Sequence, residues 1–517
     1  MIRYTSDRQL TLEGFSLPFG GKLNPDNRWI KWHKVIPWDE FAIRYYRTLD
    51  PRQGRPAKNA RLVIGALIIK HKLTLSDEET VLQIQENPYL QYFVGFYSFQ
   101  DKQPLAPSLF VEIRKRMGKD VFSAFEEVIL EKLALSKKST TNEDEKEDKG
   151  EEEPVENKGK MLVDATVAEQ AIRYPTDLSL LNEAREISEQ LIDDLYKQSD
   201  YSKKPRTYRR VRRVARKNYL NLAKKKKPGK KNLRRGLRQQ LQYVRRNLRY
   251  IDELLDNVGS APFPLPHQQQ RQYWIIQHVY RQQDEMYKKR KRRCDDRIVS
   301  IAQPHVRPIV RGKAGKNVEF GAKLSVSMVD GLAFVDHIGW DAFNEGTDLQ
   351  AQVENYKRRN GYYPAAVLAD QIYGTRENRK YLKEKGIRFG GKRMGRSPKE
   401  TEENKERLRE LKAQRIRDSR ERIPIEGKFG QGKNGYRLNY IRAKLQRTSE
   451  AWINCIFLVM NLMVLLRKLQ EQLENLYLSR FLLLRSQLNH ISARFFALFE
   501  QMPRQVLQYC LYERLAF

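Results

Sequence analysis

The chain has 517 residues, which is enough for two to four domains and at least one sizeable core. Lys and Arg number 98 against 64 Asp and Glu, and the resulting net charge of +34 calls for a polyanionic partner: nucleic acid first, an anionic membrane surface as the alternative. The chain has three cysteines, which are far apart in sequence and form no CxxC pair: Cys294, Cys455 and Cys510. This spacing excludes a disulfide framework and makes a zinc site unexpected. It fits a protein of the reducing cytosol.

Residues 1–135 are predicted to form a helical N-terminal domain. The first ten residues, MIRYTSDRQL, contain no apolar signal core. The stretch 59–73 has an apolar helical face, and Ser76 with Glu79 has the spacing of a capping box that opens the next helix. Short helices joined by tight turns suit a DNA-reading module, although the pattern alone fits a plain helical bundle equally well.

Residues 136–159 are predicted to be a disordered acidic linker. The segment 139–157 contains nine acids and no aromatic residue, so it has too little apolar surface to offset the entropy of ordering. This composition marks a domain boundary, and a core at 160–470 is expected to follow it.

A helical insert is predicted at about 175–315, directly after a buried strand at 160–167. Within it, residues 203–250 contain 21 Lys and Arg and no acid, with tyrosines interleaved. A helix with bases on one side and apolar residues on the other can lie along a phosphate backbone; the alternative is a solvated helical hairpin. The candidate phosphate-binding residues are Arg209, Arg210, Arg212, Arg213, Lys224, Lys225, Lys226 and Lys227.

The period of the apolar residues changes to two at residue 320, which indicates strands. Asp330-Gly331 lies between two such runs and predicts a tight hairpin. A helix is expected next, with Thr347 as its N-cap and Gly361 as its end. A buried strand should then end on Asp370, followed by a helix and a short strand at 387–391.

The most apolar run, residues 452–466, is 15 residues long and holds two Asn. It is shorter than the roughly 20 residues that span a bilayer, so we interpret it as a buried core helix and expect no membrane association. Residues 471–517 are predicted to be a helical C-terminal tail.

Three acids stand out as candidate metal ligands. Asp164 and Asp370 end apolar strands, where a carboxylate is costly to desolvate unless a cation or hydrogen-bond donors accompany it. Glu426 follows on a segment that Pro424 can start as a helix. Each acid has another interpretation: Asp164 could cap a turn, Asp370 the next helix, and Glu426 could pair with Arg422. If they converge, they would suit Mg²⁺, which prefers oxygen ligands and serves phosphoryl transfer, commonly as two ions.

This strand order and these acids resemble the DDE transposases of bacterial insertion sequences. The nearest resemblance is to the group named after insertion sequence five, in the superfamily shared with insertion sequence four. That superfamily carries an Arg-x3-Glu-x6-Lys signature, which Arg422, Glu426 and Lys433 match. The segments VDAT and LADQIYGT resemble the first and second Asp motifs. Some members have a Tyr three residues before the Arg, where this chain has Ser419.

The resemblance implies an α/β fold with a ribonuclease-H-like mixed-sheet core. It implies that Asp164, Asp370 and Glu426 hold two Mg²⁺ ions, with Mn²⁺ as a substitute, while Arg422 and Lys433 hold DNA phosphates. The partners would be the double-stranded ends of the element and target DNA. The protein would act as a homodimer or a larger assembly. It would be located in the bacterial cytoplasm, in association with the nucleoid. Two alternatives stay open: a nuclease of the same core without strand transfer, and an inactive DNA-binding protein.

Overall fold

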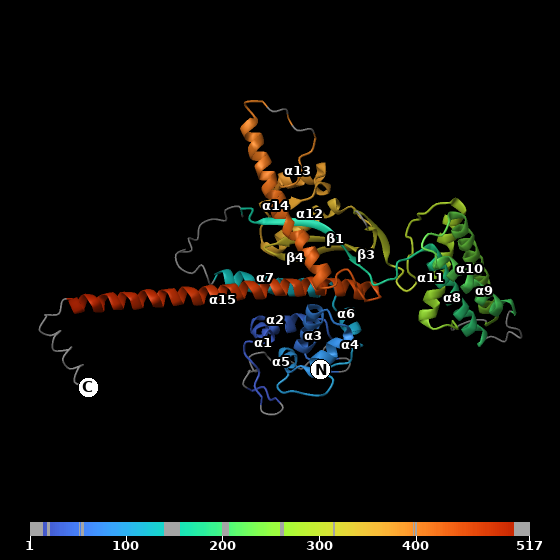
Figure 1. The fold of residues 1–517 in the computed structure, drawn as a ribbon, viewed down its shortest axis with the longest axis horizontal. Helices are drawn as coiled ribbons and strands as arrows, with labels where there is room; N and C mark the ends of the chain where they lie inside the picture. The colour runs from blue at the N-terminus through green and yellow to red at the C-terminus, as the bar shows by residue number, and fades with distance from the viewer. Residues whose placement is uncertain are drawn as a thin grey trace.

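The protein is a mixed α/β structure in which helices surround one sheet (Figure 1). The computed structural model describes residues 14–17, 21–50, 52, 56–138, 156–198, 206–258, 263–313, 316–395, 398 and 401–500. The predicted acidic linker at 136–159 falls largely outside these residues: helix α7 (Lys119–Lys138) covers its first three positions, and the description resumes at Glu156.

The sheet has six strands: β1 (Lys160–Glu169), β2 (Arg307–Lys313), β3 (Lys316–Val329), β4 (Leu332–Gly339), β5 (Ala366–Ala369) and β6 (Arg388–Phe389). Strand β1 lies between β3, to which it is antiparallel, and β5, to which it is parallel. Strand β6 extends the sheet parallel to β5, and β2 and β4 pair with successive parts of β3. The strands predicted at 160–167 and 320–340 are confirmed, and the buried strand expected before Asp370 is β5, which ends at Ala369. The expectation that Asp164 ends its strand is wrong, because pairing with β3 continues through Asp164 to Glu169.

The Asp330-Gly331 hairpin is also confirmed. It joins β3 to β4, and both residues have positive φ, 49° and 85°. Two consecutive positive φ values match the right-handed twist of the flanking strands, and Asp-Gly is the pair that tolerates them best.

The two faces of the sheet have separate cores. On one face, Met161 and Val163 of β1 pack with Leu349 and Val353 of helix α12 (Leu349–Asn360), with α13 (Arg376–Glu384) beside it. The other face packs against α7, α14 (Lys405–Gly435) and α15 (Gln446–Glu500). Alternate residues of β1 thus face opposite cores, as the strand period of two requires.

The N-terminal helices share the second of these cores. They are α1 (Arg28–Val35), α2 (Trp38–Tyr46), α3 (Ala60–Leu73), α4 (Asp77–Glu86), α5 (Pro88–Phe93) and α6 (Leu109–Arg116). The N-cap half of the predicted capping box of α4 is present, since the Ser76 side chain accepts a hydrogen bond from the Glu79 N–H at 3.0 Å. The Glu79 side chain does not complete the box with Ser76; its Oε1 accepts from Gln83 Nε2 at 3.1 Å. Buried Lys70 forms an ion pair with Asp77 at 2.8 Å and lies 4.5 Å from the ring centroid of Trp452 on α15.

The apolar run at 452–466 is a buried core helix, as predicted. It belongs to α15, whose segment Gln446–Gln472 is long and apolar enough to cross a membrane, but 83% of that apolar window is buried inside the protein. Asn461 is buried in this helix, and both ends of its side-chain amide are hydrogen-bonded to Ala333 on β4. Its Oδ1 accepts from the Ala333 N–H at 2.8 Å, and its Nδ2 donates to the Ala333 C=O at 2.7 Å. Helix α15 then continues away from the sheet to Glu500 (Figure 1); residues 501–517 of the predicted tail lie outside the described chain.

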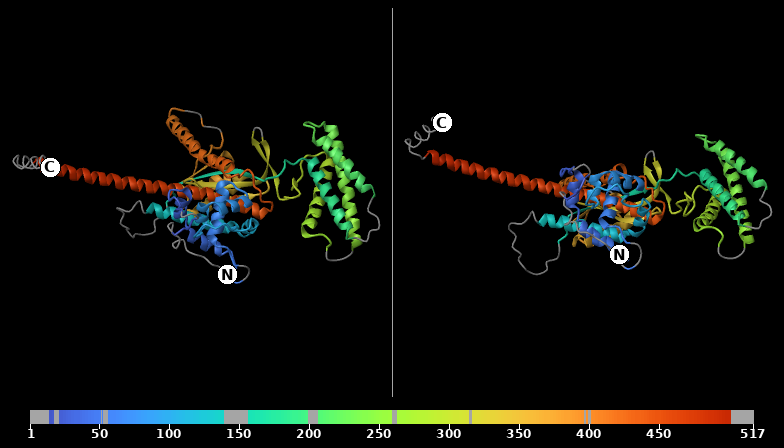
Figure 2. Two further views of the ribbon diagram at one scale, coloured as in Figure 1. Left: turned by 60° about the horizontal axis from the view of Figure 1, so that its bottom comes forward. Right: turned by 90° about the horizontal axis from the view of Figure 1, so that it is seen from below.

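The predicted insert is a bundle of four helices: α8 (Asp177–Tyr196), α9 (Arg206–Ala223), α10 (Lys230–Val258) and α11 (His267–Lys289). It has its own apolar core, formed largely by α8, α10 and α11. All views place it to one side of the sheet (Figures 1 and 2).

Two predicted helix starts are wrong. Helix α14 does not begin at Pro424 but runs through it from Lys405, because the proline lacks only one intrahelical hydrogen bond and the buried residues around it hold the helix in place. Helix α12 begins at Leu349 without a side-chain cap, after the 3₁₀ turn η3 (Glu345–Asp348) that Asn344 caps. The predicted end at Gly361 is confirmed, with φ of 84°.

Candidate active site

Asp164 lies in the middle of the central strand. Its side chain is 20% exposed, and its Oδ1 accepts a hydrogen bond from the N–H of Ala165 at 2.8 Å. The parallel pairing of β1 with β5 ends at Val163 and Ala369. The residues that follow this last pair are Asp164 and Asp370, so the two acids lie at the same height along the two neighbouring segments. The sheet thereby brings two of the three predicted acids to neighbouring positions.

Helix α14 brings the third acid to the same face of the sheet. Ile425 and Phe429 of this helix are buried in the core that it shares with β1, which fixes its rotation. Positions 422 and 426 are one turn apart and emerge beside the buried stripe. Arg422 donates from Nη1 to Asp164 Oδ2 at 3.2 Å and from Nη2 to Glu426 Oε1 at 2.8 Å. One guanidinium therefore bridges two of the predicted ligands.

Asp370 takes part in a different local interaction. It is exposed and N-caps the 3₁₀ turn η4 (Gln371–Tyr373), with its Oδ1 accepting from the Gln371 N–H at 2.7 Å. The capping role that the sequence left open for Asp370 is thus present. A second carboxylate oxygen stays available, so capping does not prevent metal binding.

The environment of Asp164 disfavours its charge. Burial raises the pKa of the Asp164 carboxyl above its ordinary value, and the nearby charges of Glu426 and Glu345 raise it further. The N–H of Ala165 and the Arg422 guanidinium act in the opposite direction. Because the raising effects dominate, an additional positive charge at this point would stabilise the ionised carboxylate.

Two residues near Asp164 were missed in the sequence. Glu345, on η3, is largely buried and forms an ion pair with Lys323 of β3. Tyr373 is fully buried, and within the described part of the chain its hydroxyl has no hydrogen-bond partner. The pKa of Tyr373 is raised by burial and then by the charges of Glu345 and Asp164. No spacing rule indicates either residue, since each lies in a short 3₁₀ turn that follows a strand.

Lys433, the base of the predicted Arg-Glu-Lys signature, lies away from the acids. Its Nζ is 3.5 Å from Glu319 Oε1 on β3, and its side chain is 21% exposed. Arg422 is therefore the base that contacts the acids, while Lys433 ties the C-terminal end of α14 to the sheet.

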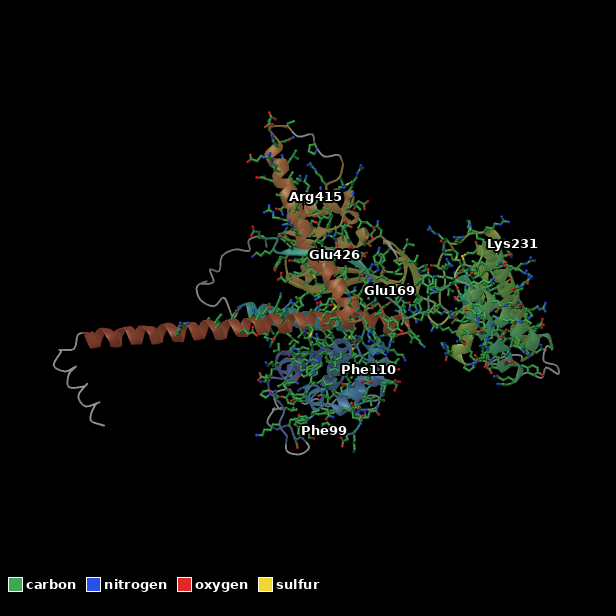
Figure 3. All side chains as sticks on the ribbon, viewed as in Figure 1. Phe99, Phe110, Glu169, Lys231, Arg415 and Glu426 are labelled. Carbon is green, nitrogen blue, oxygen red and sulfur yellow. The ribbon has the colours of Figure 1, made fainter. Side chains whose placement is uncertain are left out.

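The predicted phosphate-binding bases occupy different environments in the insert. Lys224 to Lys227 are all exposed in the turn between α9 and α10, and Arg213 is exposed on α9. Arg212 instead pairs with Asp193 Oδ2 at 2.8 Å and lies 3.5 Å from Glu189 Oε2. The side chains of Arg209 and Arg210 lie outside the described residues. Figure 3 labels Lys231 on the insert and Glu426 on α14, which belong to separate parts of the molecule.

The acids fit a hard divalent cation by their chemistry. Among the described residues, no group of three or more His, Cys, Asp or Glu side chains is close enough to hold a metal ion. However, two carboxylates already share one cationic group, Arg422, and a third directly follows the adjacent strand β5. Carboxylate oxygens are the ligands that Mg²⁺ prefers, and Mg²⁺ usually keeps several waters beside them.

Comparison with known proteins identifies the family. Residues 367–463 match the family model described as "Transposase DDE domain", and residues 18–116 match the "Transposase domain (DUF772)". The chain belongs to the DDE transposases. The first match contains Asp370 and Glu426; Asp164 and the basic insert lie outside both.

One curated relative adds a likeness without a described activity. It is an uncharacterized protein, ORF8 in the nfe locus of Rhizobium meliloti, 34% identical over 161 residues, which are 31% of this chain and 69% of the relative. Among solved structures, none matches the chain significantly. As a DDE transposase, the chain is an enzyme that acts on DNA in transposition and recombination.

Proposed function

We propose that this DDE transposase cleaves DNA at the ends of an insertion sequence and joins those ends to target DNA. The observation that carries the proposal is the bridge that Arg422 makes between Asp164 and Glu426, with Asp370 directly after the adjacent strand β5. The three acids come from β1, from the residue after β5 and from α14. We assign the element to the group named after insertion sequence five, on the signature around Glu426.

A ribonuclease-H-like core is part of the proposal. It is supported by the strand order β4-β3-β1-β5-β6, with an antiparallel half, a parallel half and the first Asp on the central strand. We place this core at 160–470, with the insert at about 175–315 and a helical tail at 471–517. Residues 1–135 are assigned as a DNA-binding domain that reads the element's ends.

Asp164, Asp370 and Glu426 would hold two Mg²⁺ ions, with Mn²⁺ as a substitute. When bound, the metal would lower the pKa of an attacking water and stabilise the leaving oxygen. The exposed bases of the insert and Arg422 would hold the phosphates and so align the scissile bond. Hydrolysis breaks one P–O bond and frees a 3′ hydroxyl; that hydroxyl then attacks a target phosphodiester and releases a target 3′ oxygen, which takes up a proton.

The partners follow from this reaction. Double-stranded element ends and target DNA are the substrates, and two ends must be held together, so we expect a homodimer or larger assembly on DNA. The cytoplasm, in contact with the nucleoid, is the expected location.

The test replaces each acid with its amide, as Asp164→Asn, Asp370→Asn and Glu426→Gln. Each variant should lose Mg²⁺-dependent cleavage by several orders of magnitude and retain DNA affinity within a few-fold, since the amide keeps the size and removes the charge. Glu421→Gln is the matched control, because Glu421 lies on the same helix and pairs with Lys160 at 2.7 Å. Normal cleavage by any of the three amide variants would remove that residue from the ligand set.

Two further outcomes separate the alternatives. A pre-cleaved element end should be joined to a supercoiled plasmid; cleavage without joining would favour a nuclease. If the parent protein binds DNA but never cleaves it with Mg²⁺ or Mn²⁺, the inactive DNA-binding alternative holds.

A further inference from the structure

Arg422 occupies the place between Asp164 and Glu426 where a cation is needed. Its two Nη atoms each contact a different carboxylate, and its side chain is 24% exposed. A planar guanidinium suits this double contact because its donors point in fixed, diverging directions. The arrangement neutralises one of two repelling charges and keeps the pair of acids together without a metal.

The same contact opposes metal binding. Asp164 Oδ2 and Glu426 Oε1 are the oxygens that Arg422 holds, and a divalent cation on them would repel the guanidinium. Arg422 must therefore withdraw before one metal ion can bind these two oxygens. Because the guanidinium is always charged, it needs another anion once it leaves.

The surroundings of Arg422 provide a route to such an anion. Glu426, one turn further along α14, is 56% exposed, so the helix face that carries both side chains is open to solvent. A methyl group added at Gly427 or at Gly430 would have no heavy atom within 4 Å. A DNA backbone can approach this face closely, and a phosphate is the anion it brings.

We propose that Arg422 couples metal binding to DNA binding: it is the internal counter-ion of Asp164 and Glu426 and moves to a DNA phosphate when a metal ion takes these carboxylates. This inference rests on the proposed function and adds a regulation to it. Two carboxylates held by their own cation bind metal weakly, and DNA strengthens that binding by removing the competitor. By linkage the effect is reciprocal, so the metal strengthens DNA binding by the same factor.

The experiment measures Mn²⁺ binding by electron paramagnetic resonance, with and without a short random-sequence duplex, which carries no element end. In the parent protein the duplex should tighten Mn²⁺ binding by about five- to tenfold, at the lower end of the usual range of such coupling, because DNA can gain no more than the removal of Arg422 gains. In Arg422→Gln the DNA-free protein should bind Mn²⁺ about three- to tenfold more tightly than the parent, which is what the loss of one or two partly exposed ion pairs permits. The duplex should then change the Mn²⁺ affinity by less than about twofold.

Two variants control for charge and for folding. Arg420→Gln removes the same charge from an exposed position on the same helix, so it should weaken DNA binding at most and leave the coupling factor unchanged. Arg422→Lys keeps the charge but cannot bridge two carboxylates with a planar fork, so its coupling factor should fall between those of the parent and Arg422→Gln.

The outcomes separate this inference from the proposed function. If Mn²⁺ binds the DNA-free parent and Arg422→Gln equally well, or if Arg420→Gln lowers the coupling as much as Arg422→Gln does, Arg422 is not the coupling residue, although the metal site stands. If the parent binds Mn²⁺ no better than Asp164→Asn, with and without DNA, the proposed metal site fails and the coupling fails with it.

Discussion

Mutation of the turn between α9 and α10 would test most directly how the insert binds DNA. Lys224, Lys225, Lys226 and Lys227 are consecutive and exposed, and within the described residues no ion pair joins any of them to an acid. We expect the replacement of all four with Gln to weaken binding to every duplex, because phosphate contacts position a protein but carry little sequence information.

The magnitude follows from counterion release. Each phosphate neutralised on duplex DNA contributes about 0.9 to the slope of log affinity against log salt, so four contacts contribute about 3.6. Between 50 and 200 mM salt, the quadruple variant should therefore lose affinity less steeply than the parent by about two orders of magnitude. The preference for element ends should persist, because we assign base reading to the N-terminal helices.

The assay is fluorescence anisotropy at five salt concentrations, on a duplex from the element's own end and on a random duplex. Arg212→Gln is the matched control within the insert, since Arg212 already pairs with Asp193 and Glu189. It should lower the stability of the bundle and leave the salt slope nearly unchanged. A quadruple variant with the parent's slope would refute phosphate contact by this turn. Loss of end preference alone would show that the insert reads bases.

Three further predictions concern α14 and α15. Gly427→Ala should raise the free energy of unfolding by about 0.5–1 kcal/mol, because Gly is a poor helix former and the added methyl meets no heavy atom. If DNA lies against this face of α14, the same variant should also cleave more slowly. An unchanged cleavage rate would argue against a close approach of DNA at Gly427. Asn461→Leu should destabilise the protein by about 2–4 kcal/mol in a urea titration, since it leaves the N–H and C=O of Ala333 unpaired, and a loss below about 0.5 kcal/mol would contradict this. Burial lowers the pKa of Lys428 to about 8, so the unfolded chain binds more protons than the folded one between about pH 8 and 10.5, and this residue makes stability rise with pH in that window. The variant Lys428→Met should lose that rise relative to the parent, and parallel stability curves would show that the amine titrates normally.

The elements of the sheet could be predicted from local pattern. The alternation at 320–328, the Asp-Gly turn and the buried runs before Asp164 and Asp370 each depend on a few neighbouring residues, and the strands lie where these patterns indicate. Helix limits were predicted less well at Pro424 and Thr347. At Pro424, long-range packing of α14 on the sheet overrides the local preference of the proline to start a helix.

The contacts within the candidate site depended on features that no local pattern contains. Arg422 and Asp164 are 258 residues apart, and their contact exists only because α14 crosses β1. Glu345 and the buried hydroxyl of Tyr373 lie near Asp164 because two short 3₁₀ turns pack against each other. The metal-binding role of the three acids stays a prediction, as does the role of the insert.

The connection between the insert and the sheet explains how more than a hundred residues can be added without disturbing the acids. The chain leaves β1 at Glu169 and returns on β2 at Arg307, and both residues pair with Gly321 of β3. A side chain at Gly321 would collide with the backbone of Ala168, so only glycine fits where the two paths meet.

The outgoing path is also tied to the helix that carries Glu426. Immediately after β1, the N–H of Ala171 donates to the C=O of Ile441 at 2.9 Å, and Ile441 lies in the short segment between α14 and α15. The segment that leads from β1 into the insert is therefore bonded to the segment that follows α14. Strand β1 carries Asp164 and α14 carries Glu426, so the two acids that Arg422 bridges lie on elements that this hydrogen bond joins at one end. The insert thus begins where these two elements are held together, and the bundle can be large without separating them.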